Sequence, residues 1–298
     1  ISFFRIFFPK KIRYPKAAKA TSVLTNTVEL AMDVLLRDSN HTTKCMARNR
    51  PERPQKGREN SMSKATVIPF GPQHPVLPEP LHLDLVVQDE TVVDVLPQIG
   101  FVHRGLEKLV ETRDYNQFIY IAERICGICA MGHSLGYAET VESLMGVEVP
   151  KRAEYLRVIW HELSRIHSHL LWLGLAADAF GFESMFMHCW RLRERVLDLF
   201  EKTTGGRVIL SVVKVGGVVR DIDASQMAEI VSVLDGIKGE YTQIMNTLLT
   251  DTSVKNRTVG VGHITTEDAA ALSMVGPFAR ASNLPYDVRS FGRGAYGD

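Results

Sequence analysis

Two thiols and an imidazole stand close together in segment 123–133, which reads Glu-Arg-Ile-Cys-Gly-Ile-Cys-Ala-Met-Gly-His. Cys126 and Cys129 form a C-x-x-C pair, and one short turn can aim both sulfurs at a single metal ion. Arg124 can favour the thiolate forms by its positive charge. His133 follows four residues after Cys129, one helical turn away if a helix begins there. The same spacing also suits a redox dithiol, half of a zinc site or two buried small residues.

Charge divides the chain into two parts. Residues 1–61 contain 13 Lys and Arg against 5 Asp and Glu, whereas residues 62–298 contain 22 against 29. A nucleic-acid-binding arm would have the same basic composition as the first part. Regular, well-patterned sequence begins directly after Met62, however, so we interpret residues 1–61 as a disordered or non-native upstream leader and expect no nucleic-acid partner. The structured domain is predicted over residues 62–298.

The composition indicates the cellular compartment of the protein and the size of its core. Four cysteines in 298 residues do not suggest a disulfide scaffold, so we expect a reducing, cytoplasmic compartment. No apolar run approaches the roughly 20 residues that a membrane-spanning helix needs. Hydrophobic residues make up 45% of the chain, which is enough for a sizeable core.

Hydrophobic periodicity predicts two kinds of element. Around Thr66–Phe70, Leu81–Leu85 and Thr91–Val95 apolar residues alternate or cluster as in strands, with Asp89-Glu90 as a turn. Helical spacing dominates the later sequence, and Gly205-Gly206 closes one of the helices. The predicted class is therefore α+β, mostly α: a small N-terminal antiparallel sheet followed by a bundle of long helices. The long helices are expected at residues 154–179, 183–202 and 224–249.

Several separate motifs, taken together, resemble one known family. They are Arg-Ile-Cys-Gly-Ile-Cys-x-x-x-His at 124–133, His-Arg-Gly-Leu-Glu at 103–107, Gly-Pro-Gln-His-Pro at 71–75, Val-Gly-Gly-Val at 215–218 and Ala-Arg-Ala-Ser at 279–282. Their order resembles that in the large, catalytic subunit of energy-converting (Ech-type, group 4) nickel–iron hydrogenases, which is related to the 49-kDa subunit of respiratory complex I. The resemblance covers residues 62–298 and implies the fold of those subunits.

The resemblance implies a role for each sulfur. In that family four cysteines hold nickel and an iron that carries cyanide and carbon monoxide, and thiolates are soft donors suited to such metals. Cys126 would be a terminal nickel ligand, and Cys129 would bridge nickel and iron. His133 would donate a hydrogen bond toward the bridging sulfur. The alternative for His133 is a core histidine whose hydrogen bonds are satisfied.

Three more residues receive expectations from the same source. Glu79, on a proline-flanked turn, occupies the place of the family's proton-relay glutamate; otherwise it is an exposed loop residue. Glu107 would help to hold a magnesium ion, or would instead pair with Arg104 or Arg124. His74 lies in a turn that lines the quinone pocket of complex I relatives, and here it belongs to a proton path or is structural.

Other ionisable residues are given structural interpretations. His161, His167 and His169 share one predicted helix, but their spacing is not H-E-x-x-H, so a zinc-peptidase site is not indicated. Glu162 and Arg165 are expected to form surface or inter-helix pairs. Cys189 is expected to be a buried helix residue, as most free cysteines are.

No cysteine follows Cys189, whereas the family carries a second C-x-x-C near its C terminus. We therefore expect a C-terminally truncated chain that is inactive alone.

The parent enzyme would reduce protons reversibly to H2, coupled to ion translocation. Its expected partners are an iron–sulfur small subunit with a [4Fe-4S] cluster, a ferredoxin-like electron carrier and integral-membrane ion-pumping subunits, at the inner face of the cell membrane. The alternatives are a complex I subunit that contributes to a quinone site and a zinc-binding or assembly module.

Overall fold

The computed structural model describes residues 65–75, 77, 79–292 and 294–297 of the chain, which belong to one unit that begins at Ala65. The predicted leader, residues 1–61, and its boundary at Met62 lie outside the described residues. Among the residues described, no helix combines the length and the apolar character needed to cross a membrane.

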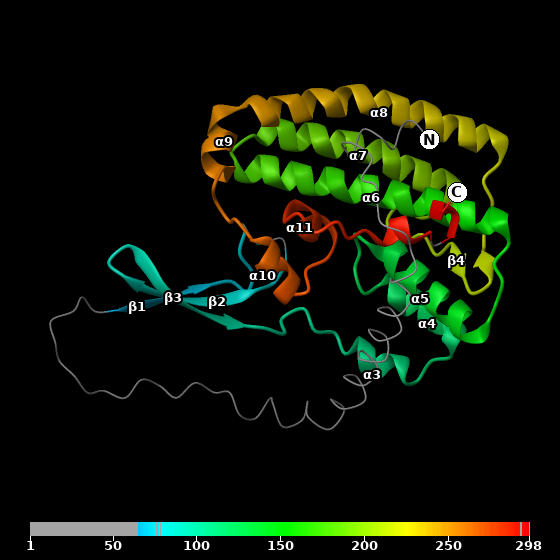
Figure 1. Cartoon of the computed structure of the whole chain (residues 1–298), viewed down its shortest axis with the longest axis horizontal. Helices are drawn as coiled ribbons and strands as arrows, with labels where there is room; N and C mark the ends of the chain where they lie inside the picture. Colours follow the sequence, from blue (N-terminus) through cyan, green and yellow to red (C-terminus); the bar gives the residue numbers. More distant parts are fainter. Residues whose placement is uncertain (1–64, 76, 78, 293, 298) are drawn as a thin grey trace. The chain divides into compact units, whose positions relative to one another are not determined.

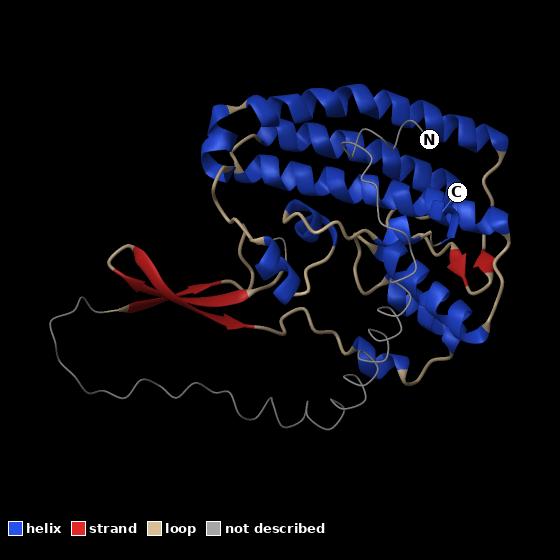
Figure 2. Ribbon diagram, viewed as in Figure 1, coloured by secondary structure: helices blue, strands red, loops and turns tan. Residues whose placement is uncertain are grey.

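The N-terminal sheet is antiparallel, as the sequence predicts (Figure 2). Its strands are β1 (Thr66–Phe70), β2 (His82–Gln88) and β3 (Thr91–Gln98), in that order. Ile68 pairs with Leu85, which pairs with Val95, and residues directly opposite each other on neighbouring strands point to the same face of a sheet. The tight turn at Asp89-Glu90 joins β2 to β3, and a register irregularity at Val86/Val87 lies beside it.

Short helices connect the sheet to the long ones (Figure 1). Leu106–Val110 forms α3, and Tyr115–Glu123 forms α4, whose N terminus is capped by the Asp114 side chain. Ala130–Met145 forms α5, and Gly146 ends it in the left-handed conformation. The segment 124–129, which holds the cysteine pair, is therefore the connection between α4 and α5.

Three long helices form the predicted bundle, and α7 packs against both α6 and α8 (Figure 1). They are α6 (Lys151–Ala179), α7 (Glu183–Thr204) and α8 (Ala224–Thr250), each within three residues of the predicted bounds. Gly205 ends α7 at φ 82°, a backbone conformation that glycine adopts without strain. Asp223 begins α8 through a reciprocal capping box with Gln226.

The core lies between these helices and two short strands. Trp160 of α6 is fully buried, and its indole nitrogen donates to Thr203 Oγ1 of α7 at 3.2 Å. Burial of such large side chains supplies most of the driving force for packing the bundle. The short hairpin of β4 (Val213–Lys214) and β5 (Gly217–Val218) contacts α5 and α6. The remaining elements are α9 (Thr252–Thr258), α10 (Thr266–Ala271), α11 (Gly276–Ala281), η4 (Val288–Phe291) and η5 (Gly294–Gly297).

A buried ion pair fixes α5 against α6. Arg157 of α6 donates to both carboxylate oxygens of Glu142 of α5, at 2.9 and 2.6 Å. The same guanidinium donates to the Gly217 carbonyl, while the Gly216 amide donates to Glu142 at 2.7 Å. Two buried charges are tolerated because each is hydrogen-bonded several times. This pair secures the C-terminal half of the helix whose N terminus carries the cysteines.

Candidate metal centre

The cysteine pair and His133 come together at the N terminus of α5. Cys129 is the N-cap of the helix, and the amides of Gly132 and His133 both donate to its carbonyl, at 2.9 and 3.3 Å. The two sulfurs and one imidazole nitrogen all lie within 4.8 Å of one another. Two thiols and an imidazole form a soft donor set, so the residues fit a thiolate-bound transition metal. The start of a helix also favours negative charge on the sulfurs.

The two thiols influence each other's ionisation. Burial alone would raise the pKa of Cys126, but hydrogen bonds from the Cys129 thiol and from the backbone amides of Cys129 and Ile128 lower it. Burial, donation of its own proton to Cys126 and the negative charge of Cys126 raise the pKa of Cys129 to about 12. In the metal-free chain Cys126 is thus the preferred thiolate, and Cys129 keeps its proton.

Two side chains distant in sequence hold the cysteine loop. Arg104 donates from Nη2 to the carbonyls of Arg124 and Ile125, each at 2.7 Å. His167 of α6, only 1% exposed, lies 3.1 Å through Nε2 from the carbonyl of Ile128. A carbonyl can only accept, so Nε2 carries the proton. Burial and the charge of Arg193 lower the pKa of His167 to about 4, which keeps its ring neutral.

A buried carboxylate anchors the start of the same loop. Glu123, the last residue of α4, accepts hydrogen bonds from the backbone amide of Ser211 at 3.1 Å and from its hydroxyl at 2.9 Å. Burial raises the pKa of Glu123, although the hydrogen bonds from Ser211 and Ser134 oppose this. Sequence patterns alone did not reveal Glu123 or His167, because their partners lie 88 and 39 residues away and no local signal marks them.

Glu79 lies on an exposed loop, and its charge acts on both thiols. After burial and the hydrogen bonds within the pair, the carboxylate charge of Glu79 also raises the pKa of both Cys126 and Cys129. Such an electrostatic effect requires that the carboxylate lie near the sulfurs. Glu79, 47 residues before Cys126 in sequence, is therefore near enough for its charge to act on the thiols, and its role as proton relay stays a prediction.

Glu107 lies on the short helix α3. Its side chain is 84% exposed and stands 3.6 Å from His103, four residues earlier. Of the two alternatives for Glu107, the structure does not show the pairing with an arginine: Arg104 and Arg124 donate to backbone carbonyls, and Glu107 contacts His103. Binding of magnesium by Glu107 stays a prediction.

Three further residues from the sequence analysis have defined surroundings. The ring of His74 packs against Phe70, with the ring centroids 4.2 Å apart. Cys189 is fully buried in α7, in agreement with the expectation from sequence. Glu162 and Arg165, each expected to form a surface or inter-helix pair, instead pair with each other along α6, and the Glu162 carboxylate is buried.

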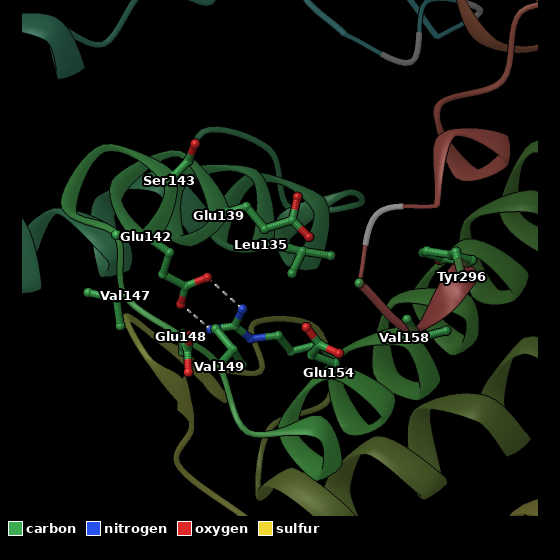
Figure 3. Close-up of a pocket in the computed structure, with 13 residues that line it drawn as sticks. Leu135, Glu139, Glu142, Ser143, Val147, Glu148, Val149, Glu154, Val158 and Tyr296 are labelled. Atoms are coloured by element: carbon green, nitrogen blue, oxygen red, sulfur yellow. Dashed lines mark hydrogen bonds and ion pairs between the residues drawn. The ribbon is translucent and has the colours of Figure 1, made fainter. Parts of the chain in front are cut away.

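A separate cavity of about 670 Å³ opens beside the second half of α5 (Figure 3). The Glu142 carboxylate points toward the guanidinium of Arg157, and dashed lines mark this ion pair; Glu139, Glu148 and Glu154 also line the cavity. The cysteines do not line this cavity. It is therefore not the candidate metal centre.

Comparison with family models identifies two segments. Residues 104–176 match the nickel-dependent hydrogenase family, and residues 179–294 match the 49-kDa subunit family of the respiratory-chain NADH dehydrogenase. The first match contains the cysteine loop and most of α6, and the second contains α7 and α8. The two matches adjoin, so one continuous fold carries both signatures.

Curated relatives include both hydrogenase and dehydrogenase subunits. A subunit of the F(420)H(2) dehydrogenase of Methanosarcina mazei is 39% identical over 76% of this chain and 61% of the relative. The alpha subunit of the membrane-bound hydrogenase of Pyrococcus furiosus is 40% identical over 74% of this chain and 52% of the relative. A subunit of the NADH-quinone oxidoreductase of Koribacter versatilis is 38% identical over 78% of this chain and 58% of the relative. The chain thus spans about half to three fifths of the length of these relatives.

A solved structure supports the same assignment. A chain of the membrane-bound sulfane sulfur reductase, an archaeal respiratory membrane complex, superimposes with a TM-score of 0.72 at 30% identity, over 76% of this chain and 60% of the other. The mostly helical architecture with a small antiparallel sheet is therefore the fold of these subunits. The chain belongs to the family that unites the nickel–iron hydrogenase large subunits with the 49-kDa subunits of complex I.

Proposed function

We propose that this chain provides thiolate ligands to a nickel–iron centre in the catalytic subunit of a membrane-associated hydrogenase. The observation that carries the proposal is the convergence of Cys126, Cys129 and His133 within 4.8 Å at a helix N terminus. Cys126 would be the terminal nickel ligand and Cys129 the bridging one. When bound, the nickel–iron group with its cyanide and carbon monoxide ligands supplies the reversible reduction of protons to H2.

The chain's own residues prepare the site. Arg104 and His167 fix the loop by hydrogen bonds to its carbonyls, which holds both sulfurs in one turn. Outer residues of this kind orient metal ligands and tune their basicity. His133 can bind or hydrogen-bond at the cluster, and Glu79 can exchange protons there from an exposed loop. These positions suit a reaction that moves protons beside a thiolate-bound metal.

Names of the relatives support a multi-subunit assembly, and one of them is membrane-bound. A membrane-bound hydrogenase subunit and the formate hydrogenlyase subunit 5 of Escherichia coli are each 40% identical to this chain. We therefore propose partners of three kinds: an iron–sulfur small subunit with a [4Fe-4S] cluster, a ferredoxin-like electron carrier and integral-membrane ion-pumping subunits. The chain itself would lie peripherally on the inner membrane surface, with ion translocation coupled through the membrane partners.

A quinone-site subunit is the second candidate. It is favoured by the match of residues 179–294 to the 49-kDa family and by relatives named NADH-quinone oxidoreductase. Quinone-reducing relatives generally lack nickel-ligand cysteines, so the pair at 126 and 129 favours the hydrogenase.

Metal analysis tests the choice. The intact complex, produced with its maturation machinery, should contain nickel, and the double variant Cys126→Ser/Cys129→Ser should lose it. Cys189→Ser is the matched control, because Cys189 is buried in α7 away from the cluster. Nickel absent from the wild type, or retained by the double variant, would refute the proposal; zinc in its place would indicate a zinc-binding module.

A further inference from the structure

A tyrosine near the end of the described chain joins two residues of α6. The hydroxyl of Tyr296 lies 3.0 Å from His161 Nδ1 and donates to Glu162 Oε1 at 2.6 Å. Arg165, one turn later on α6, also donates to the Glu162 carboxylate. More than 130 residues separate the tyrosine from its partners, so this contact is a product of the tertiary fold.

The hydrogen bonds determine where the protons lie. An ionised carboxylate only accepts, so the Tyr296 hydroxyl proton points at Glu162. The Tyr296 oxygen can then only accept from His161, which places a proton on Nδ1. A neutral imidazole carries one proton, and Nε2 of His161 is therefore left with a free lone pair.

That free nitrogen faces the first turn of α5. A Cβ atom built on Gly132 would lie 3.6 Å from His161 Nε2. Gly132 stands three residues after Cys129 and directly before His133, and residues three and four apart share a helix face. The imidazole therefore lies beside the first turn of α5, the turn that begins at Cys129 and includes His133.

Burial and the charges around the ring keep the imidazole of His161 neutral. Burial lowers the pKa of His161, the positive charges of Arg165 and Arg289 lower it further, and only Glu162 raises it. Glu162 stays ionised, because hydrogen bonds from Arg165 and Tyr296 outweigh burial and lower its pKa. Burial and the neighbouring Glu162 raise the pKa of Tyr296, so its hydroxyl keeps its proton.

We infer that His161 is a proton acceptor for the metal centre, held in the required tautomer by Tyr296 and Glu162. A proton released at the cluster moves to the Nε2 lone pair and converts the imidazole to imidazolium; no electron moves with it. The new positive charge is stabilised by the Glu162 carboxylate, through the Tyr296 hydroxyl. Tyr296 and Glu162 are positioning residues. The role at the metal rests on the proposed hydrogenase function, whereas the tautomer does not.

This acceptor differs from Glu79 in its setting. Glu79 is exposed on a loop, whereas the His161 ring is mostly buried and held by a hydrogen bond at Nδ1. A fixed neutral base enclosed by protein transfers protons without reorganising solvent. The two groups therefore provide an inner and an outer exchange position for protons.

Nitrogen NMR of the full metal-free chain tests the tautomer. Long-range proton–nitrogen correlations should show His161 with Nδ1 protonated and Nε2 bare, and His161→Gln identifies its signals. Tyr296→Phe should allow the Nε2-protonated form to appear. Tyr137→Phe is the control, since its hydroxyl donates to the Tyr115 carbonyl instead. A wild-type His161 protonated on Nε2, or a tautomer unchanged in Tyr296→Phe, would overturn the inference.

Proton exchange in the intact complex tests the role. His161→Gln should slow hydrogen–deuterium exchange of H2 by about a hundredfold, the lower end of general acid–base effects, with nickel content unchanged. Gly132→Ala should slow exchange as well, because its methyl would cover Nε2 at a contact distance of 3.6 Å. The tautomer should not change, because it is determined by the hydrogen bond at Nδ1. Full exchange in His161→Gln with nickel present would overturn this inference alone. Absence of nickel from the wild type would instead overturn the proposed function.

Discussion

The two ends of α5 are built for different purposes. At its C-terminal half Glu142 is buried, and both oxygens of its carboxylate are bound by Arg157 or the Gly216 amide. At its N terminus Cys129 is exposed, and its side chain does not cap the helix. One end has its polar groups satisfied by the chain, and the other presents donor atoms that can bind a metal. The stabilising ion pair and the candidate metal centre thus lie toward opposite ends of one helix.

The largest loss of stability is expected when the ion pair in the C-terminal half of α5 is broken. Arg157→Ala leaves the Glu142 carboxylate buried without its cation, which typically costs about 3–5 kcal/mol of unfolding free energy. Urea denaturation of the full chain measures this loss. Arg152→Ala is the matched control, because Arg152 pairs with Asp221 at the surface and should matter far less. Equal losses in both variants would remove the contrast between the two ends.

The loop beneath the cluster should be of intermediate sensitivity. His167→Phe keeps a ring in the core but leaves the Ile128 carbonyl without its donor, at a cost of about 1–3 kcal/mol. Because that carbonyl lies between the two cysteines, affinity for a thiolate-binding metal should fall about 10- to 100-fold. Competition titration with cobalt measures the affinity, and His188→Phe serves as the control on α7. An unchanged affinity would show that the loop holds both thiols in place without the hydrogen bond from His167.

The buried carboxylate before the loop should give a pH dependence. The folded-state pKa of Glu123 is raised above the ordinary 4.5, so its protonated form is favoured by folding. Its contribution to stability is present below pH 4.5 and is lost as pH rises through the folded-state pKa. Relative to wild type, Glu123→Gln should therefore become more stable as pH increases through this window. Denaturation at several pH values checks the slope, and a slope of opposite sign would contradict it.

The smallest effect is expected at Glu107. Its exposed contact with His103 should contribute almost nothing, so Glu107→Gln should leave the denaturation midpoint of the chain unchanged. Magnesium content of the intact complex is the sharper measurement. A lower content in Glu107→Gln would support the predicted magnesium role, and an unchanged content would end it.

Local patterns predicted most of the fold and one half of the site. Alternation indicated the three strands, helical periodicity indicated α6, α7 and α8, and the spacing of Cys126 and Cys129 indicated the cluster. Contacts between distant segments could not be predicted, because periodicity carries no information about which helix contacts which loop. The sequence therefore did not distinguish His167 from the other two histidines of its helix. The hydrogen bond between His161 and Tyr296 has no local sequence signal either.

Glu107 shows the opposite failure. An arginine partner was the alternative to magnesium binding there, but Arg104 donates to carbonyls of the cysteine loop and Arg124 donates to the carbonyl of Tyr120. Backbone acceptors left over at the ends of helices compete for nearby guanidinium groups. A sequence motif does not reveal this competition.

The register of the N-terminal sheet has a practical consequence for anyone who produces this chain. Ile68 and Val95 lie on the same face of the sheet and are 47% and 41% exposed. Open strand edges beside an apolar face promote self-association and precipitation. The chain should therefore be difficult to keep in solution at high concentration when made alone, and Val95→Lys should improve its recovery.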